Sequence, residues 1–297
     1  SGQTSQPPWK LDNNIYSDVV VADNKAVLFQ VKQKENNLDF NFIGDISNKE
    51  ATKKIKTIFD LDFNLNKFYK YLNNQPELAG MTNFCRDLRL FLAKDKFECV
   101  ISSVCSANNS IVRWTKSIDD IKKSWGNKYT YSEKDYFTFP DVSDFKNIYC
   151  DDVEEFECCS NLNNPGECIN NLKSCGVGYR APYMKKASEI FTLEMDLDDI
   201  SKMSYDEAFD TMLKVPGVGP KVADCILLYG FNFRQAFPTD VWIKRIVSYL
   251  YFDGKDINVS KIREFGMEEF GDYAGYVQLY LFHYARMSGL MKKLKGM

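Results

Sequence analysis

The most informative segment of this chain is residues 215–225, which read VPGVGPKVADC. Apolar residues at helical spacing precede this segment over 205–213 and begin again within it, so two helices are expected to meet at a glycine-rich hairpin. Gly217 and Gly219 allow the backbone to turn tightly and to approach another molecule closely. Free amides at the start of the second helix can bind a phosphate group. The segment therefore predicts a hairpin between helices whose shape suits a DNA backbone.

Lys221 lies in the first turn of the second helix. The positive end of the helix dipole and burial both disfavour an ammonium ion there, so we expect a neutral amine, which is a nucleophile. A second signal is Asp240, at the entrance of an amphipathic helix that begins at Val241. Each feature alone has an ordinary structural interpretation: a solvated lysine after a helix connector, and a carboxylate that only caps a helix. We give more weight to the two features together, in this order along the chain.

The chain before residue 50 has a different period. Apolar residues alternate with others over 19–31 and 38–42, with turns expected at Asp23-Asn24 and Asn36-Asn37. This pattern predicts a small antiparallel sheet with one buried face, after which the strands stop and helical spacing takes over. The expected fold class is α+β. The irregular acidic segment 141–174 is interpreted as an inserted loop.

Composition limits the function less than these motifs do. The 297 residues carry a net charge of −3, which argues against a protein that holds DNA by bulk electrostatics. A DNA-binding face must then be built locally, from a few cations and helix N-termini. We expect no membrane-spanning segment, no signal peptide and reduced cysteines, and hence an intracellular protein.

The hairpin, Lys221 and Asp240 resemble the helix-hairpin-helix (HhH-GPD) DNA glycosylases, and further segments are similar to the 8-oxoguanine DNA glycosylases of that family. The resemblance implies a β domain over 1–65 and a helical catalytic region over 66–297, in two subdomains with the active-site cleft between them. It implies a bifunctional repair enzyme that flips 8-oxoguanine, paired with cytosine, out of duplex DNA. By the same resemblance, Lys221 is expected to form a Schiff base with C1′ that leads to β-elimination, and Asp240 is expected to stabilise the positive charge on the sugar. The implied partner is chromosomal double-stranded DNA containing 8-oxoguanine, bound by a monomer without a cofactor.

The same resemblance implies a pocket for the flipped base. Gln278 meets its Watson–Crick edge, while Phe282 and Cys225 cover its two faces. The carbonyl of Gly2 accepts the N7 hydrogen that 8-oxoguanine has and guanine lacks. Core packing is the ordinary alternative for Phe282 and Cys225 taken singly.

A second set of residues is expected to contact the DNA around the lesion. The segment SVCSANNSIVR, residues 103–113, resembles a helix start of the same family, and the resemblance implies that Asn108 fills the gap left by the flipped base. Arg113 and Arg180 hydrogen-bond the orphaned cytosine, and Tyr179 is the wedge beside it. The hairpin that binds the phosphate backbone consists of Gly217, Val218 and Gly219. Trp242 replaces the phosphate-binding histidine of animal relatives, and we expect it to pack in the core.

Two other functions remain open from the sequence. One is a monofunctional alkylbase glycosylase of the same fold, against which Lys221 and Gln278 speak. The other is a non-catalytic helix-hairpin-helix module that binds DNA or a repair partner. A metal site at Cys150, Cys158, Cys159 and Cys168 is disfavoured because their spacing matches no zinc or cluster pattern, and no metal is expected.

Overall fold

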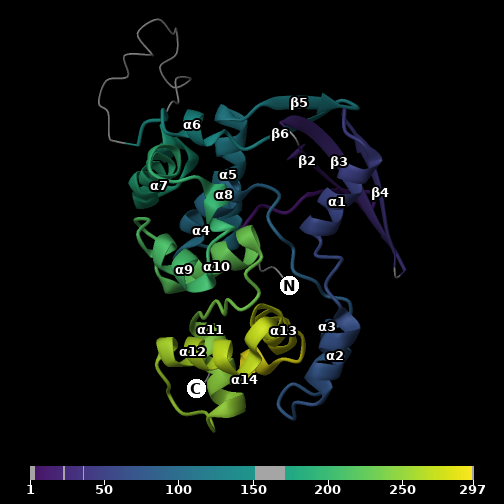
Figure 1. Cartoon of the computed structure of the whole chain (residues 1–297), viewed down its shortest axis with the longest axis vertical. Coiled ribbons are helices and arrows are strands. Elements are labelled where there is room, and N and C mark those ends of the chain that lie inside the picture. Colours follow the sequence, from purple (N-terminus) through teal and green to yellow (C-terminus); the bar gives the residue numbers. More distant parts are fainter. Residues whose placement is uncertain (1–3, 23, 36, 151–170, 296–297) are drawn as a thin grey trace, which may run out of the picture.

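The computed structural model of the chain describes residues 4–22, 24–35, 37–150 and 171–295. The first element of the fold is a four-stranded antiparallel sheet (Figure 1). Its strands are β1 (Lys10–Asp12), β2 (Ile15–Ala22), β3 (Lys25–Lys34) and β4 (Asn37–Ile43), in that spatial order. The predicted sheet and the α+β class are confirmed. The alternation had not indicated β1, which has only three residues, all of them exposed.

One face of the sheet is covered by α1 (Asn48–Ile58). Ser47 starts this helix with a capping box, in which its side chain and that of Glu50 satisfy each other's backbone amides. Ile55 and Ile58 of α1 pack against a cluster that includes Phe29 of β3. The apolar side of each strand is thereby removed from water.

A second hairpin, β5 (Lys128–Tyr131) and β6 (Lys134–Phe137), covers the other face of the sheet, where Tyr136 packs on Val19 and Leu28. The expectation that strands stop after residue 50 was therefore wrong. Ser132 and Glu133 both adopt positive φ, of 47° and 64°, as a two-residue hairpin turn requires. This hairpin belongs to the helical part of the chain and reaches back across the sheet (Figure 1).

The remaining chain is mostly helical. The longer helices are α2 (Leu65–Asn73), α4 (Lys96–Ser106), α5 (Ile111–Trp125), α7 (Ala181–Leu193), α9 (Tyr205–Leu213), α10 (Pro220–Phe231), α11 (Val241–Tyr251), α12 (Val259–Phe270) and α13 (Ala274–Met287). Short elements are α3 (Thr82–Cys85), α6 (Val142–Phe145), η3 (Leu172–Cys175), η4 (Gly178–Arg180), α8 (Leu197–Ile200), η5 (Gly271–Tyr273) and α14 (Leu290–Leu294). None of the helices in the described ranges is long and apolar enough to cross a membrane.

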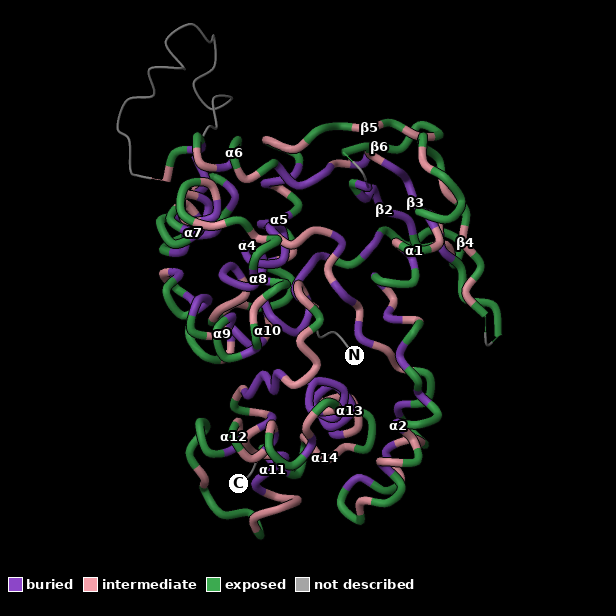
Figure 2. Tube along the Cα trace, viewed as in Figure 1, coloured by how far each residue is buried: buried purple, intermediate pink, exposed green. Residues whose placement is uncertain are grey.

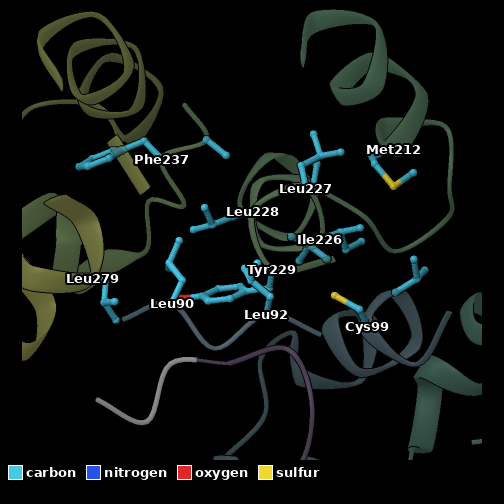
Figure 3. Close-up of a cluster of buried hydrophobic side chains, with 14 of the residues drawn as sticks. Leu90, Leu92, Cys99, Met212, Ile226, Leu227, Leu228, Tyr229, Phe237 and Leu279 are labelled. Atoms are coloured by element: carbon cyan, nitrogen blue, oxygen red, sulfur yellow. The ribbon is translucent and has the colours of Figure 1, made fainter. Parts of the chain in front are cut away.

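These helices form two groups. One contains α4 to α10, and the other contains α11 to α14 with α2 and α3 beside them (Figure 1). Buried residues concentrate on the inner strands and on α4, α10 and α13 (Figure 2). Helix α10 is central: Figure 3 shows Met212 and Cys99 on one side of it, and Phe237 and Leu279 on the other. The helix that carries Lys221 is thus part of the core that joins the two groups.

Candidate active site

The hairpin between α9 and α10 has the predicted form. Gly217 adopts a φ of +82°, and a Cβ at this position would lie 2.8 Å from the ring of Tyr183. Only glycine meets both conditions without strain. Gly219 is the N-cap of α10 and Pro220 is its first residue, so no side chain caps the new helix.

The backbone amides of this hairpin differ in availability. The N–H of Val218 donates to the carbonyl of Val215 at 3.0 Å, and the Val218 side chain is buried. The N–H groups of Gly217 and Gly219 have no hydrogen-bond partner in the described part of the chain, and both residues are exposed. Two of the three residues expected to bind phosphate therefore offer an amide, and Val218 instead anchors the turn.

Lys221, Cys225 and Asp240 interact at the start of α10. Lys221 donates a hydrogen bond to the sulfur of Cys225, one helical turn later. Cys225 and then the carboxylate of Asp240 raise the pKa of Lys221, against the opposing effect of burial. Burial raises the pKa of Cys225, and the neighbouring Lys221 opposes this shift. The expected neutral amine was wrong for the resting protein: its neighbours stabilise the ammonium ion.

Asp240 caps α11 and faces Lys221 at the same time. Its Oδ1 atom accepts from the backbone N–H of Trp242 at 2.9 Å and of Ile243 at 2.8 Å. The second oxygen, Oδ2, makes no hydrogen bond to any residue that the structure describes. The carboxylate is thereby held by one oxygen, while its charge acts on Lys221. The capping role and a catalytic role are compatible in this geometry.

Gln278 of α13 is oriented by its surroundings. Its side chain is buried, and Nε2 donates to the carbonyl of Pro238 at 3.2 Å. A carbonyl can only accept, so the NH₂ group must face Pro238 and the Oε1 atom must face away. Oε1 is buried and has no hydrogen-bond partner among the described residues. Such an unpaired acceptor is costly unless a ligand satisfies it.

Phe282 lies one helical turn after Gln278 and is half-buried, with the guanidinium of Arg286 5.9 Å from its ring. Cys225 is half-buried as well. Partial exposure at both positions is more typical of the wall of a site than of a closed core.

Gly2 lies outside the described residues, but the chain that follows it is firmly anchored. The side chain of Gln6 donates to the carbonyl of Leu92 at 2.8 Å and accepts from the N–H of Lys94 at 3.1 Å. Ser5 hydrogen-bonds Cys99, whose pKa also reflects the neighbouring Cys225. The chain at Ser5 and Gln6 is therefore fixed close to Cys225.

The four residues expected around the orphaned base differ in solvent exposure and in hydrogen bonding. Asn108 is exposed with a φ of +50°, and the guanidinium of Arg113 makes no hydrogen bond or ion pair within the described part of the chain. Tyr179 is 59% exposed. Arg180 is buried instead, and it donates to the carbonyls of Ala107 at 2.6 and 2.9 Å and of Asn108 at 3.0 Å. Most donors of Arg180 are thus occupied in holding the loop that presents Asn108.

Two aromatic residues near the site have roles that the sequence did not reveal. Tyr183 packs on Gly217 and contacts the ring of Tyr179 edge to face at 6.3 Å, so it joins the hairpin to the expected wedge. The pattern Gly-Tyr-Arg-Ala-Pro-Tyr at 178–183 was the available signal. Trp242 was expected to pack in the core. It is half-buried instead, with the guanidinium of Arg245 5.5 Å from its ring.

Of the four cysteines weighed as metal ligands, Cys158, Cys159 and Cys168 lie outside the described residues. No group of three or more ligating side chains occurs in the described ranges.

Comparison with known proteins finds similarities that together cover nearly the whole chain. Residues 1–100 match the profile of the 8-oxoguanine DNA glycosylase N-terminal domain, and residues 101–271 match that of the HhH-GPD superfamily base excision DNA repair proteins. A protein of Methanothermobacter thermautotrophicus named probable N-glycosylase/DNA lyase is 43% identical over 99% of this chain and 94% of its own length. The N-glycosylase/DNA lyase of Saccharomyces cerevisiae is 26% identical, over 95% and 80%.

Solved structures agree. Clostridium acetobutylicum 8-oxoguanine glycosylase/lyase in complex with double-stranded DNA, with cytosine opposite 8-oxoguanine, superposes with a TM-score of 0.77 at 30% identity, covering 96% of this chain and 89% of that chain. With the sheet, the hairpin and the Lys221–Asp240 pair in place, the chain belongs to the HhH-GPD superfamily of base excision DNA repair proteins, among its 8-oxoguanine DNA glycosylases.

Proposed function

We propose that this protein excises 8-oxoguanine opposite cytosine from duplex DNA and then cleaves the strand at the abasic site. The observation that carries the proposal is the interaction of Lys221 with Cys225 and with the charge of Asp240 next to the exposed hairpin, on a chain that matches N-glycosylase/DNA lyases over nearly its full length. The enzyme acts as a monomer. Residues 1–65 form the β domain that holds the N-terminal segment, and residues 66–297 carry the chemistry.

Base recognition rests on Gln278. The exposed edge of a flipped guanine presents the N1–H and N2–H donors, which the unpaired Oε1 atom of Gln278 can accept. Phe282 and Cys225 cover the two faces of the base, and a carbonyl at Gly2 accepts the N7 hydrogen of the oxidised base. Guanine lacks that hydrogen and leaves the carbonyl facing a lone pair, which disfavours it.

Base release and strand cleavage use the same lysine. After losing a proton, Lys221 attacks C1′ as the bond from C1′ to N9 breaks, and the departing base takes up a proton. The sugar ring opens to a Schiff base, loss of a C2′ proton expels the 3′ phosphate, and water then hydrolyses the imine. The charge of Asp240 acts on Lys221, and in this proposal it also stabilises the positive charge that develops on the sugar in the transition state.

The proposal is tested with a set of duplexes that carry 8-oxoguanine opposite each of the four bases, together with duplexes that contain 3-methyladenine or an abasic site. Excision of 8-oxoguanine with strand cleavage, fastest opposite cytosine, is expected. Base release from 3-methyladenine alone would identify a monofunctional alkylbase glycosylase. Binding of all duplexes without turnover would identify a non-catalytic DNA-binding module.

Replacing Gln278 with methionine is expected to slow excision of 8-oxoguanine about 5- to 150-fold, because the lesion's donors are left unpaired in a buried site at a cost of about 1–3 kcal/mol. Methionine has a similar length and preserves packing on α13. Single-turnover rates on the cytosine duplex measure the effect. Tyr284→Phe, six residues along the same helix, is the control and should retain wild-type rates. A wild-type rate for the methionine variant would remove Gln278 from base recognition.

Arg113 and Arg180 are expected to affect the opposite base differently. Arg113→Ala should reduce the preference for cytosine about 5- to 100-fold, since one bidentate reader is worth about 1–3 kcal/mol. Arg180→Lys should slow excision opposite all four bases to a similar degree, because Arg180 holds the loop of Asn108. Rates on the four-duplex set give both answers. Loss of cytosine preference only in the Arg180 variant would reverse the assignment.

A further inference from the structure

A largely buried cluster of Tyr205, Asp224 and Arg263 joins three helices, one of which carries Lys221. Asp224 of α10 is fully buried, and its Oδ2 accepts from Nε of Arg263 at 2.7 Å while Oδ1 accepts from Nη2 at 3.1 Å. The hydroxyl of Tyr205 on α9 donates to the same Oδ1 and accepts from Nη2 of Arg263 at 2.5 Å. The guanidinium also lies 4.0 Å from the ring of Phe209.

The cluster spans the two groups of helices. Tyr205 and Asp224 belong to the two helices of the hairpin, whereas Arg263 comes from α12, which packs against α11 in the other group (Figure 1). Asp240 is the N-cap of α11. The cluster therefore links the helix that carries Lys221 to the group that carries Asp240.

The ion pair of Asp224 with Arg263 holds α10 near the end of the helix that carries Lys221. Asp224 precedes Cys225 directly and follows Lys221 by three residues, which is almost one helical turn. Further along α10, Leu228 packs on Gly275 of α13, where a Cβ would lie only 2.4 Å from Cδ1 of Leu228. Helix α10 is thus tied to the second group at two points along its length, and the polar one lies nearer to Lys221.

The chemistry of the cluster favours a fixed geometry. An arginine that donates two hydrogen bonds to one carboxylate sets both the distance and the orientation of the pair. Buried charges persist only while they are paired, so neither partner can move away alone. A 1 Å displacement of a catalytic group is enough to slow a reaction about 100-fold. The cluster is suited to keep α10 and α12 at one separation.

We propose that Tyr205, Asp224 and Arg263 are positioning residues, which hold α10 against α12 at the separation that lets Lys221 and Asp240 act on one nucleotide. This inference rests on the proposed glycosylase function. It assigns to the cluster a role in the chemical step and not in DNA binding, because none of the three side chains belongs to the exposed hairpin.

The test compares Arg263→Lys with a matched control. Lysine keeps the charge but cannot donate the paired hydrogen bonds, so the single-turnover rate of 8-oxoguanine excision should fall about 10- to 100-fold. The dissociation constant for a duplex with a tetrahydrofuran abasic analogue should change less than about threefold, because the DNA-binding surface is intact. Asp224→Asn, which keeps an acceptor at the same place, should give a smaller loss of rate.

Arg234→Lys is the control, because the Nη2 atom of Arg234 makes an ion pair, 2.6 Å long and with a single hydrogen bond, with the buried Asp60 beyond the far end of α10. Arg234→Lys should lower the melting temperature by about as much as Arg263→Lys does, and it should leave the excision rate unchanged. Equal loss of rate in both arginine variants, or an unchanged rate in Arg263→Lys, would overturn the positioning role. An inactive wild-type protein would refute the proposed function, whereas active wild type with active variants refutes only the positioning role.

Discussion

Lys221→Gln is expected to abolish borohydride trapping of the protein on 8-oxoguanine DNA and to slow base excision by roughly 10³-fold or more, as removal of a catalytic nucleophile does. Trapping requires a Schiff base, which only an amine can form with the sugar. Glutamine is close in length to lysine and preserves the start of α10. The exposed Lys202, outside the site, provides the control: Lys202→Gln should trap as the wild type does. Trapping that persists in the Lys221 variant would place the nucleophile elsewhere.

The raised pKa of Lys221 adds a pH dependence to this prediction. The ammonium form predominates below the raised pKa, and only the deprotonated amine attacks C1′. The single-turnover rate should therefore increase as the pH rises from about 6 to about 9, by up to tenfold per unit while attack is rate-limiting. A rate that is flat across this range would mean that the amine is already neutral in the DNA complex.

Asp240→Asn is expected to slow base release by about 10²- to 10³-fold while leaving duplex binding measurable. Asparagine keeps an oxygen that can accept from the N–H groups of Trp242 and Ile243, so the start of α11 should remain intact. The charge that stabilises the sugar cation is lost.

The substitution has a second consequence for Lys221. Asp240 helps to raise the pKa of Lys221, so the rising limb of the pH profile should move to lower pH in the Asn variant. Single-turnover profiles of the two proteins, compared on the cytosine duplex, measure both effects. If Asp240→Asn keeps the wild-type rate and Asp240→Ala alone is slow, the residue serves only as a helix cap.

Local patterns in the sequence were sufficient for the main elements of the fold. Alternation predicted the first sheet, and the glycines at 217 and 219 predicted the turn into α10. The hairpin of β5 and β6 was not predicted from the sequence, because each strand has only four residues and most of these are partly or fully exposed. Its apolar contacts are with Val19 and Leu28, about a hundred residues earlier in the chain.

The protonation state of Lys221 could not be obtained from its position alone. The helix dipole and burial both lower the pKa of an amine, and this reasoning applies to a lysine considered without its neighbours. Cys225, one turn later on α10, and Asp240 oppose the effect of burial, and Asp240 comes near Lys221 only after α10 and α11 are packed. Arg180 is a similar case, because its carbonyl partners at Ala107 and Asn108 are more than 70 residues away in the chain.

The covering of the first sheet by β5 and β6 has a consequence for synthesis on the ribosome. Val19 and Leu28 leave the exit tunnel long before Tyr136, which completes their packing. The nascent sheet can bury one face on α1 but must keep the other in water until residues 128–137 have been translated. The amino-terminal part should therefore mature late although it is made first, and expressed alone it should be prone to self-association through that bare face.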